Sequence, residues 1–282
     1  LDAGLSEIVA DAQWTPVAQN LGFVEGPVWH PDGSLLFSDI PNSRIHRLRG
    51  AALDTYRDPS GNANGLTLDA DMRLLACEHG NRRVSLERDD EVETLASHYD
   101  GKRLNSPNDI IVRNDGRIFF TDPPYGIEDS QRELPFNGVF TIASDGGEPA
   151  LLVSDFDRPN GLALSPDERT LYIADTQRLH VRAFDVAADG PLSNGRVFAD
   201  MAEGGRPDGM KVDVDGRLYV SAGTLQVFAP DGAPLGVIDC PQPPANCAWG
   251  DDGSTLYITA RTAVYRLRFS VRGIAPAWRG RA

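Results

Sequence analysis

Residues 108–122 read NDIIVRNDGRIFFTD. A polar residue opens this segment, a short apolar run follows, and a second hydrophobic run comes after Asn114-Asp115-Gly116. Asn and Gly tolerate the positive φ angles that tight hairpin turns require. The segment therefore predicts two short antiparallel β-strands joined by a turn.

The same pattern occurs six times along the chain. Successive copies begin 39, 44, 52, 48 and 38 residues apart, close to the about 40–50 residues of a four-stranded propeller blade. The copies are EGPVWHPDGSLLFSD from Glu25, NGLTLDADMRLLACE from Asn64, NDIIVRNDGRIFFTD from Asn108, NGLALSPDERTLYIAD from Asn160, DGMKVDVDGRLYVSA from Asp208 and NCAWGDDGSTLYITA from Asn246. Further β-type runs follow the copies, and no stretch keeps a helical apolar period. We expect an all-β, six-bladed β-propeller with four-stranded antiparallel blades around a central channel.

The whole chain, residues 1–282, is expected to form this single domain. Its 28 glycines and 20 prolines suit many short strands and turns, and no linker composition divides it. Thr15–Leu21 precedes the first copy and is expected to add a strand to the last blade, which would close the ring. Residues 1–14 are expected to form a less ordered N-terminal segment.

Charge and composition narrow the classes of partner. A net charge of −14 disfavours binding to nucleic acid or to an anionic membrane, and no run of 18 apolar residues occurs. We expect a small-molecule ligand and a monomer or weak dimer. The start of the chain lacks a signal-peptide pattern, which favours the cytoplasm, with the periplasm as the alternative if an upstream segment is removed. Cys240 and Cys247 could pair in an oxidising compartment, whereas reduced thiols suit the cytoplasm.

The first residue of every copy is a carboxylate or an amide. The innermost strand of each blade lines the channel, so these six side chains are expected to surround one axis. A ring of oxygen ligands suits one divalent cation, with Ca²⁺ preferred and Mg²⁺, Mn²⁺ or Zn²⁺ as alternatives. Glu25 and Asp208 would neutralise its charge. The competing interpretation is that Asn and Asp are simply common where a strand begins.

Such a cation can polarise a carbonyl while a carboxylate activates water. We expect a metal-dependent hydrolase that opens a small sugar-type lactone, with Asp208 as the catalytic base. Two alternatives are a non-enzymatic propeller that binds a ligand or partner around a structural metal, and a related propeller esterase or phosphotriesterase.

Four copies end in an acid, at Asp39, Glu78, Asp122 and Asp175. We expect structural roles for Asp39 and Asp175, whereas Glu78 and Asp122 could equally face the channel. The longest gap contains residues 123–137, PPYGIEDSQRELPFN, in which Tyr125 and Phe136 could close over a ligand. A plain surface excursion is the alternative for this loop. The full set of expected substrate contacts is Asn64, Glu78, Asn105, Asn108, Asp122 and Tyr125.

Several strings together resemble the SMP-30/gluconolactonase/LRE-like family over residues 20–270. They are Glu25-Gly26-Pro27, Asn105-Ser106-Pro107-Asn108-Asp109, Arg158-Pro159-Asn160-Gly161 and Arg206-Pro207-Asp208-Gly209-Met210. Residues 77–83 (CEHGNRR) and 121–126 (TDPPYG) are similar to the bacterial gluconolactonase branch.

The resemblance implies a six-bladed propeller with a divalent metal in its channel. It implies that Glu25, Asn160 and Asp208 are metal ligands, that Asn108 is a further ligand or substrate contact, and that Asp208 is the base. One departure concerns substrate choice, because Ser106 stands where animal members carry a substrate-contacting arginine. Arg103 lies nearby in sequence but cannot simply replace it.

Overall fold

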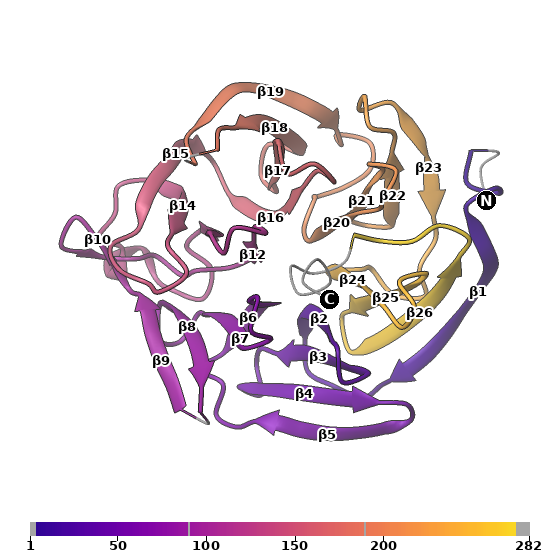
Figure 1. Ribbon diagram of the computed structural model, residues 1–282, viewed down its shortest axis with the longest axis horizontal. Helices are drawn as coiled ribbons and strands as arrows, with labels where there is room; N and C mark the ends of the chain where they lie inside the picture. Colours follow the sequence, from indigo (N-terminus) through magenta and orange to yellow (C-terminus); the bar gives the residue numbers. More distant parts are fainter. Residues whose placement is uncertain (1–3, 90, 189, 275–282) are drawn as a thin grey trace.

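The computed structural model describes residues 4–89, 91–188 and 190–274. It contains six four-stranded antiparallel sheets, which stand as blades around a central channel (Figure 1). The chain passes through the blades in order and runs outward from the channel within each one. The expected six-bladed β-propeller is therefore confirmed.

Every blade has its first strand at the channel and its last strand on the outside of the ring. Blade 1 contains β2 (Val24–His30), β3 (Ser34–Asp39), β4 (Arg44–Arg49) and β5 (Ala52–Arg57), and blade 2 contains β6 (Ala63–Leu68), β7 (Leu74–Glu78), β8 (Arg83–Arg88) and β9 (Glu91–Ala96). Blade 3 contains β12 (Ile110–Val112), β13 (Ile118–Asp122), β14 (Asn137–Ile142) and β15 (Ala150–Phe156), and blade 4 contains β16 (Pro159–Leu164), β17 (Thr170–Asp175), β18 (His180–Val186) and β19 (Leu192–Asp200). Blade 5 contains β20 (Met210–Val212), β21 (Leu218–Ser221), β22 (Leu225–Phe228) and β23 (Pro234–Ile238), and blade 6 contains β24 (Asn246–Gly250), β25 (Thr255–Ala260), β26 (Ala263–Phe269) and β1 (Val9–Ala18).

The N-terminal strand closes the ring. β1 pairs antiparallel with β26 on the outer edge of blade 6, with Val9 opposite Phe269 and Ala18 opposite Val264 (Figure 1). The expectation of a closing strand is confirmed, but the strand begins at Val9 rather than Thr15. Residues 9–14, for which less order was expected, therefore belong to the blade. Leu5 is fully buried in the apolar cluster beneath this strand, which explains why the segment is held in place.

Apolar side chains from adjacent blades pack into shared clusters. Phe120 and Phe140 of blade 3 stack with ring centroids 5.4 Å apart, in a cluster that includes Leu75 of blade 2. Trp29 of blade 1 stacks in the same way on Tyr257 of blade 6 at 5.4 Å. Because each cluster spans two sheets, the core is a ring of contacts between blades, and the channel itself can remain polar.

Two small elements lie outside the blades. β10 (His98–Tyr99) and β11 (Lys102–Arg103) form a short hairpin, and the 3₁₀ helix η1 (Asp129–Gln131) lies within the long loop of residues 123–137. In the described part of the chain no helix has the length and apolar character needed to span a membrane. Cys77, Cys240 and Cys247 are free thiols.

Candidate active site at one end of the channel

Five of the six repeat-opening residues meet in one cavity. Glu25, Asn64, Asn108, Asn160 and Asp208 all line a cavity of about 570 Å³ at one end of the channel. The sixth, Asn246, is buried and hydrogen-bonds Glu25 and Asp109, without lining the cavity. The shared position in each repeat therefore does bring distant residues together around one axis.

Small residues after the ring position let the inner strands approach closely. A Cβ on Gly26 would lie 1.9 Å from the carbonyl oxygen of Asn64, and one on Gly161 would lie 2.2 Å from that of Asp208. Any larger side chain at these two positions would push neighbouring blades apart. The glycines thus set the narrow spacing that holds the ring side chains within reach of one another.

The three asparagines form a chain of side-chain hydrogen bonds. Asn64 Nδ2 donates to Asn108 Oδ1 at 2.7 Å, and Asn108 Nδ2 donates to Asn160 Oδ1 at 2.6 Å. Asn160 Nδ2 continues the chain to Thr176 Oγ1 at 3.0 Å. Since all three amides are buried, this chain fixes their orientation around half of the cavity floor.

Carboxylates occupy the other half of the floor. Burial, followed by the charge of Asp208, raises the pKa of Glu25 well above its usual value. Burial and then the charge of Asp109 raise the pKa of Asp208 to about 7, although the Arg261 guanidinium opposes this rise. The pKa of Asp109 is itself raised by burial, against the charge of Lys211. Three acids thus share a small volume with little compensating charge.

This donor set fits a hard divalent cation. Carboxylate and amide oxygens are the ligands that Ca²⁺ accepts, and two neighbouring carboxylates such as Glu25 and Asp208 are stabilised when a dication binds between them. The described residues contain no group of three or more His, Cys, Asp and Glu side chains suited to a metal. The candidate set is of a different kind, because two of its four members, Asn108 and Asn160, are amides.

A histidine and a tyrosine cover the amide side of the cavity. His79 Nε2 lies 3.2 Å from Asn108 Oδ1 and 3.3 Å from Asn64 Nδ2. Burial lowers the pKa of His79 to about 4, so the ring is neutral at physiological pH. The Tyr125 ring lies 6.4 Å from the His79 ring, and Asn160 Nδ2 lies 3.4 Å from the Tyr125 hydroxyl. The long loop therefore supplies one cavity wall through Tyr125, as expected.

Three expected substrate contacts do not line the cavity. The Glu78 carboxylate accepts hydrogen bonds from Arg83 Nε at 2.7 Å and Ser85 Oγ at 2.6 Å. The Asn105 amide donates to two backbone carbonyls, those of Asp122 and Phe136. The Asp122 carboxylate accepts from the backbone N–H groups of Asn105 and Ser106, both at 2.7 Å. These hydrogen bonds hold strands and loops together, so the structure gives the three side chains structural contacts and does not bring them to the cavity.

The acids that end the second strands share this role. Asp39 accepts from the backbone N–H of Gly22 at 3.1 Å, and Asp175 accepts from that of Asp157 at 2.9 Å, as Asp122 does in its own blade. Each carboxylate thereby caps the loop that leads into the innermost strand of its blade. Phe136 is also corrected, because it packs against Tyr99 and Phe140 instead of closing over the cavity.

Sequence reasoning missed several residues around the cavity. Asp109 follows a ring position directly, where the other copies have Gly or Cys, and this departure from the repeat could have identified it. Arg206 and Arg261 line the cavity from two loops, and Phe23 lines it from the segment before β2. Phe23 and Arg206 each stand two residues before a ring position, but the residue type at this place varies between copies. Arg261 lies after the sixth copy, so the repeat gave no signal for it.

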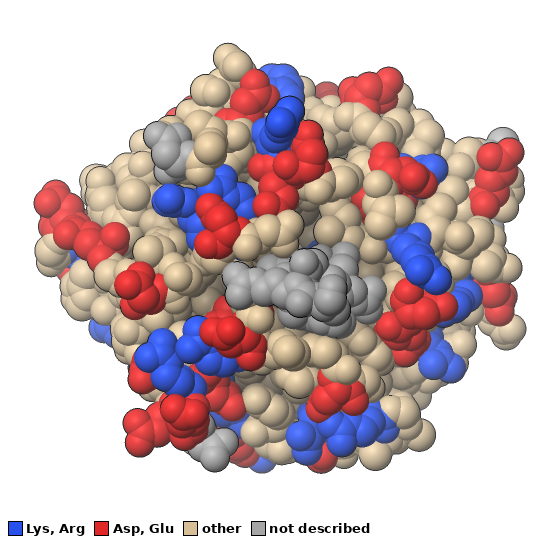
Figure 2. All heavy atoms as spheres, viewed as in Figure 1, with Lys and Arg blue, Asp and Glu red and all other residues tan. Residues whose placement is uncertain are grey.

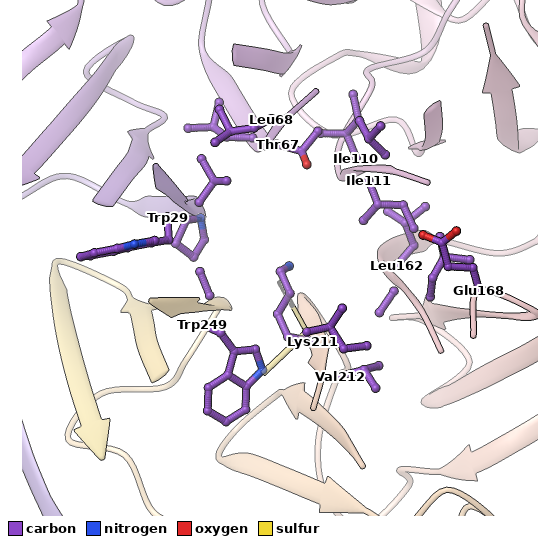
Figure 3. A pocket seen from close by; sticks show the side chains of 18 of the residues that line it. Trp29, Thr67, Leu68, Ile110, Ile111, Leu162, Glu168, Lys211, Val212 and Trp249 are labelled. Carbon is purple, nitrogen blue, oxygen red and sulfur yellow. The ribbon is translucent and has the colours of Figure 1, made fainter. Parts of the chain in front are cut away.

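A second cavity of about 150 Å³ lies at the opposite end of the channel. It is bordered by later residues of the same inner strands, among them Trp29, Leu162 and Trp249 (Figure 3). Lys211 is the side chain that reaches into its middle. This end offers no ring of oxygen ligands among the residues that the structure describes.

Fold and site together define a class: a closed six-bladed propeller with an oxygen-lined cavity at one end of its channel. Comparison with known proteins agrees. The family model of the SMP-30/gluconolactonase/LRE-like region matches residues 23–262. The chain belongs to the SMP-30/gluconolactonase/LRE-like family.

Individual relatives support this placement. A gluconolactonase from Zymomonas mobilis is 35% identical, over 94% of this chain and 81% of its own length. A pentonolactonase from Haloferax volcanii is 28% identical, over 83% of this chain and 80% of its own. Among solved structures, a gluconolactonase from Xanthomonas campestris superposes with a TM-score of 0.89 and 37% identity, covering 95% of this chain and 93% of that one.

Proposed function

We propose that this protein is a hydrolase that opens small sugar-type lactones and depends on one divalent cation. The observation that carries the proposal is the cavity floor, where Glu25 and Asp208 face an ordered chain of amides. The gluconolactonase and pentonolactonase relatives support the substrate class.

Glu25, Asn108, Asn160 and Asp208 would hold the cation, with Ca²⁺ as the best match to an all-oxygen donor set. The bound cation would supply Lewis-acid polarisation of the lactone carbonyl. Asp208 would accept the proton of the attacking water, because its carboxylate lies on the cavity floor beside the proposed cation, where water and the lactone carbonyl would meet. Asn64 and Tyr125 would orient substrate hydroxyl groups through hydrogen bonds.

The reaction balances without any further reactant. The water oxygen bonds to the acyl carbon, the bond between that carbon and the ring oxygen breaks, and the ring oxygen leaves as a hydroxyl group. The acid that forms ionises at neutral pH and releases one proton. Hydrolysis can therefore be followed directly as acid production.

The test is a pH-stat assay on a panel of aldonolactones, corrected for spontaneous hydrolysis. Protein treated with a chelator is compared with protein reloaded with Ca²⁺, Mg²⁺, Mn²⁺ or Zn²⁺. We expect glucono-1,5-lactone hydrolysis that chelation abolishes and that Ca²⁺ restores best. Absence of turnover on every lactone with every metal would contradict the proposal.

The same samples separate the competing functions. A structural metal in a non-enzymatic propeller would raise the thermal unfolding temperature without any turnover. A propeller esterase or phosphotriesterase would turn over aryl esters or phosphotriesters faster than lactones. We expect the metal to affect both stability and lactone turnover, and the lactones to be the better substrates.

A further inference from the structure

Two arginines line the rim of the candidate active site without an ion-pair partner. Arg206 comes from the loop between β19 and β20, and Arg261 from the turn between β25 and β26. Both side chains are exposed, and no ion pair or side-chain hydrogen bond joins either guanidinium to another described residue. Their positive charge is therefore available to a ligand.

Arginines elsewhere in this acidic chain commonly pair with carboxylates. Arg47 Nη2 lies 2.9 Å from Asp54 Oδ2, and Arg268 Nη2 lies 2.7 Å from Asp252 Oδ2. On the face drawn in Figure 2, basic side chains lie beside acidic ones. With a net charge of −14, carboxylates are abundant. Arg206 and Arg261 differ from these paired arginines, because they line one cavity and no carboxylate neutralises either guanidinium through an ion pair among the described residues.

The inner part of the cavity, its floor, is acidic, whereas its exposed outer part, the rim, carries the two arginines. The floor carries Glu25 and Asp208, which face the reacting carbonyl in the proposed function. Arg206 and Arg261 are instead carried by loops, beside the apolar residues Phe23, Pro243 and Pro244. The Arg261 guanidinium carbon lies 5.8 Å from the centre of the Phe23 ring. A lactone with its carbonyl at the floor would present its far end to the arginines.

We propose that the cavity takes aldonolactones that carry an anionic group at the end remote from the carbonyl, and that Arg206 and Arg261 bind this group. The proposal rests on the proposed lactone hydrolysis and names its substrate class. A guanidinium binds a carboxylate or a phosphate through paired N–H donors, so either anion would satisfy the site. A cavity of about 570 Å³ has room for a sugar lactone with such a substituent.

The experiment compares three lactones on the metal-loaded protein. Glucono-1,5-lactone is neutral, 6-phosphoglucono-1,5-lactone carries a phosphate, and glucaro-1,4-lactone carries a carboxylate. We expect kcat/KM for at least one anionic lactone to exceed that for the neutral lactone at least tenfold. The two anionic arms identify which anion the site prefers, and equal kcat/KM for all three lactones would overturn the proposal.

Substitutions at Arg206 and Arg261 test whether these arginines cause the preference for anionic lactones. Arg206→Gln, Arg261→Gln and the double variant are compared with Arg169→Gln, which changes an exposed arginine outside the cavity. Arg206→Gln should raise KM for the anionic lactone and leave neutral-lactone turnover within about twofold. The double variant should lower the ratio of anionic to neutral kcat/KM at least tenfold, whereas Arg169→Gln should change neither quantity. An equal loss on neutral and anionic lactones would mean that the arginines act on Asp208 or on the fold, and would overturn the proposal.

A binding measurement keeps the test independent of turnover. Calorimetric titration with 6-phosphogluconate, glucarate and gluconate reports affinity even if no lactone is hydrolysed. Tighter binding of a ligand with a second anionic group, if it is lost in the double variant, supports the anion site even if the lactonase proposal fails. Equal affinities for all three ligands, or affinities unchanged in the double variant, would overturn it.

Discussion

The two ends of the channel are built from the same inner strands but differ in chemistry. In blade 4, Asn160 contributes to the polar cavity, whereas Leu162 and Leu164 of the same strand border the apolar one. In blade 1, Glu25 and Trp29 divide in the same way. In five of the six blades the residue that opens the copy lines the polar cavity, and later residues of the same copy border the apolar one. The channel therefore has one polar end and one apolar end.

This contrast explains why a ring of acids and amides does not destabilise the molecule. Burying several polar groups is costly unless hydrogen bonds or charges compensate for the loss of water. At the polar end the asparagines satisfy one another, while beyond them aromatic and aliphatic residues pack the channel. Lys211, at the apolar end, provides a positive charge that opposes the raised pKa of Asp109. Substitutions at either end can test this division.

The largest effect is expected at the polar end, from Asp208→Asn. Loss of the proposed base should lower kcat for glucono-1,5-lactone by about 10²–10⁴-fold at saturating Ca²⁺. Calorimetry checks that the variant still binds the cation. Asp71→Asn, at an exposed turn of blade 2, is the matched control and should keep normal kcat. Near-normal turnover by a metal-loaded Asp208→Asn protein would remove Asp208 from the role of base.

At the apolar end, Trp249→Ala should affect stability but not chemistry. Trp249 is 5% exposed and packs edge-on against Tyr219 and Phe269, with ring centroids 5.1 and 5.2 Å away. Its truncation should lower the free energy of unfolding by about 3–5 kcal/mol, measured by urea denaturation. KM and kcat, measured below the unfolding transition, should stay within about twofold. Trp249→Phe should lose less stability, and a tenfold rise in KM for Trp249→Ala would show that the two ends are coupled.

A smaller effect, on how stability depends on pH, is expected to distinguish two buried acids, Asp122 near the polar end and Asp213 near the apolar end. Asp213 pairs with Arg217 at 2.8 Å in the turn after β20, whereas Asp122 accepts only backbone hydrogen bonds within the described residues. Burial raises the pKa of Asp122 to about 7. The folded chain then keeps a proton that the unfolded chain loses above pH about 4, so Asp122 should lower stability as pH rises from about 4 to 7.

The corresponding variant is Asp122→Asn. The neutral amide cannot accept both backbone hydrogen bonds, so the variant should be less stable at pH 4 by about 1 kcal/mol. This deficit should shrink and then reverse toward pH 7, because only the wild type carries the pH-dependent cost, which is about 1.4 kcal/mol per unit of pKa shift. Urea denaturation at several pH values measures the difference. A deficit that stays constant with pH would mean that the pKa of Asp122 is not raised.

The repeat made the ring predictable. Five copies keep the same spacing from ring residue to the aspartate of the hairpin turn, and the sixth is one residue shorter. This shared register identified Glu25, Asn64, Asn108, Asn160 and Asp208 as neighbours. Strand order and ring closure followed from the same argument.

The roles of other polar positions could not be assigned from the sequence. Glu78 and Asp122 end their strands with acids that could face the channel or a loop, and only the backbone N–H groups and arginines around them decide between the two. Arg206 stands two residues before a ring position, as Arg158 does in blade 4, yet only Arg206 lines the cavity. Arg261 lies in a turn after the sixth copy, so its place at the cavity is visible only in the folded chain.

The closing strand has a consequence for how the protein is made. Among the described strands β1 is synthesised first, whereas its partner β26 is synthesised last. Until then Leu5 and Ile8 lack the apolar residues of blade 6 that bury them in the finished molecule. Such distant pairing slows folding and exposes apolar surface to other chains. During synthesis, closure of the ring is therefore expected to wait until β26 is available to pair with β1.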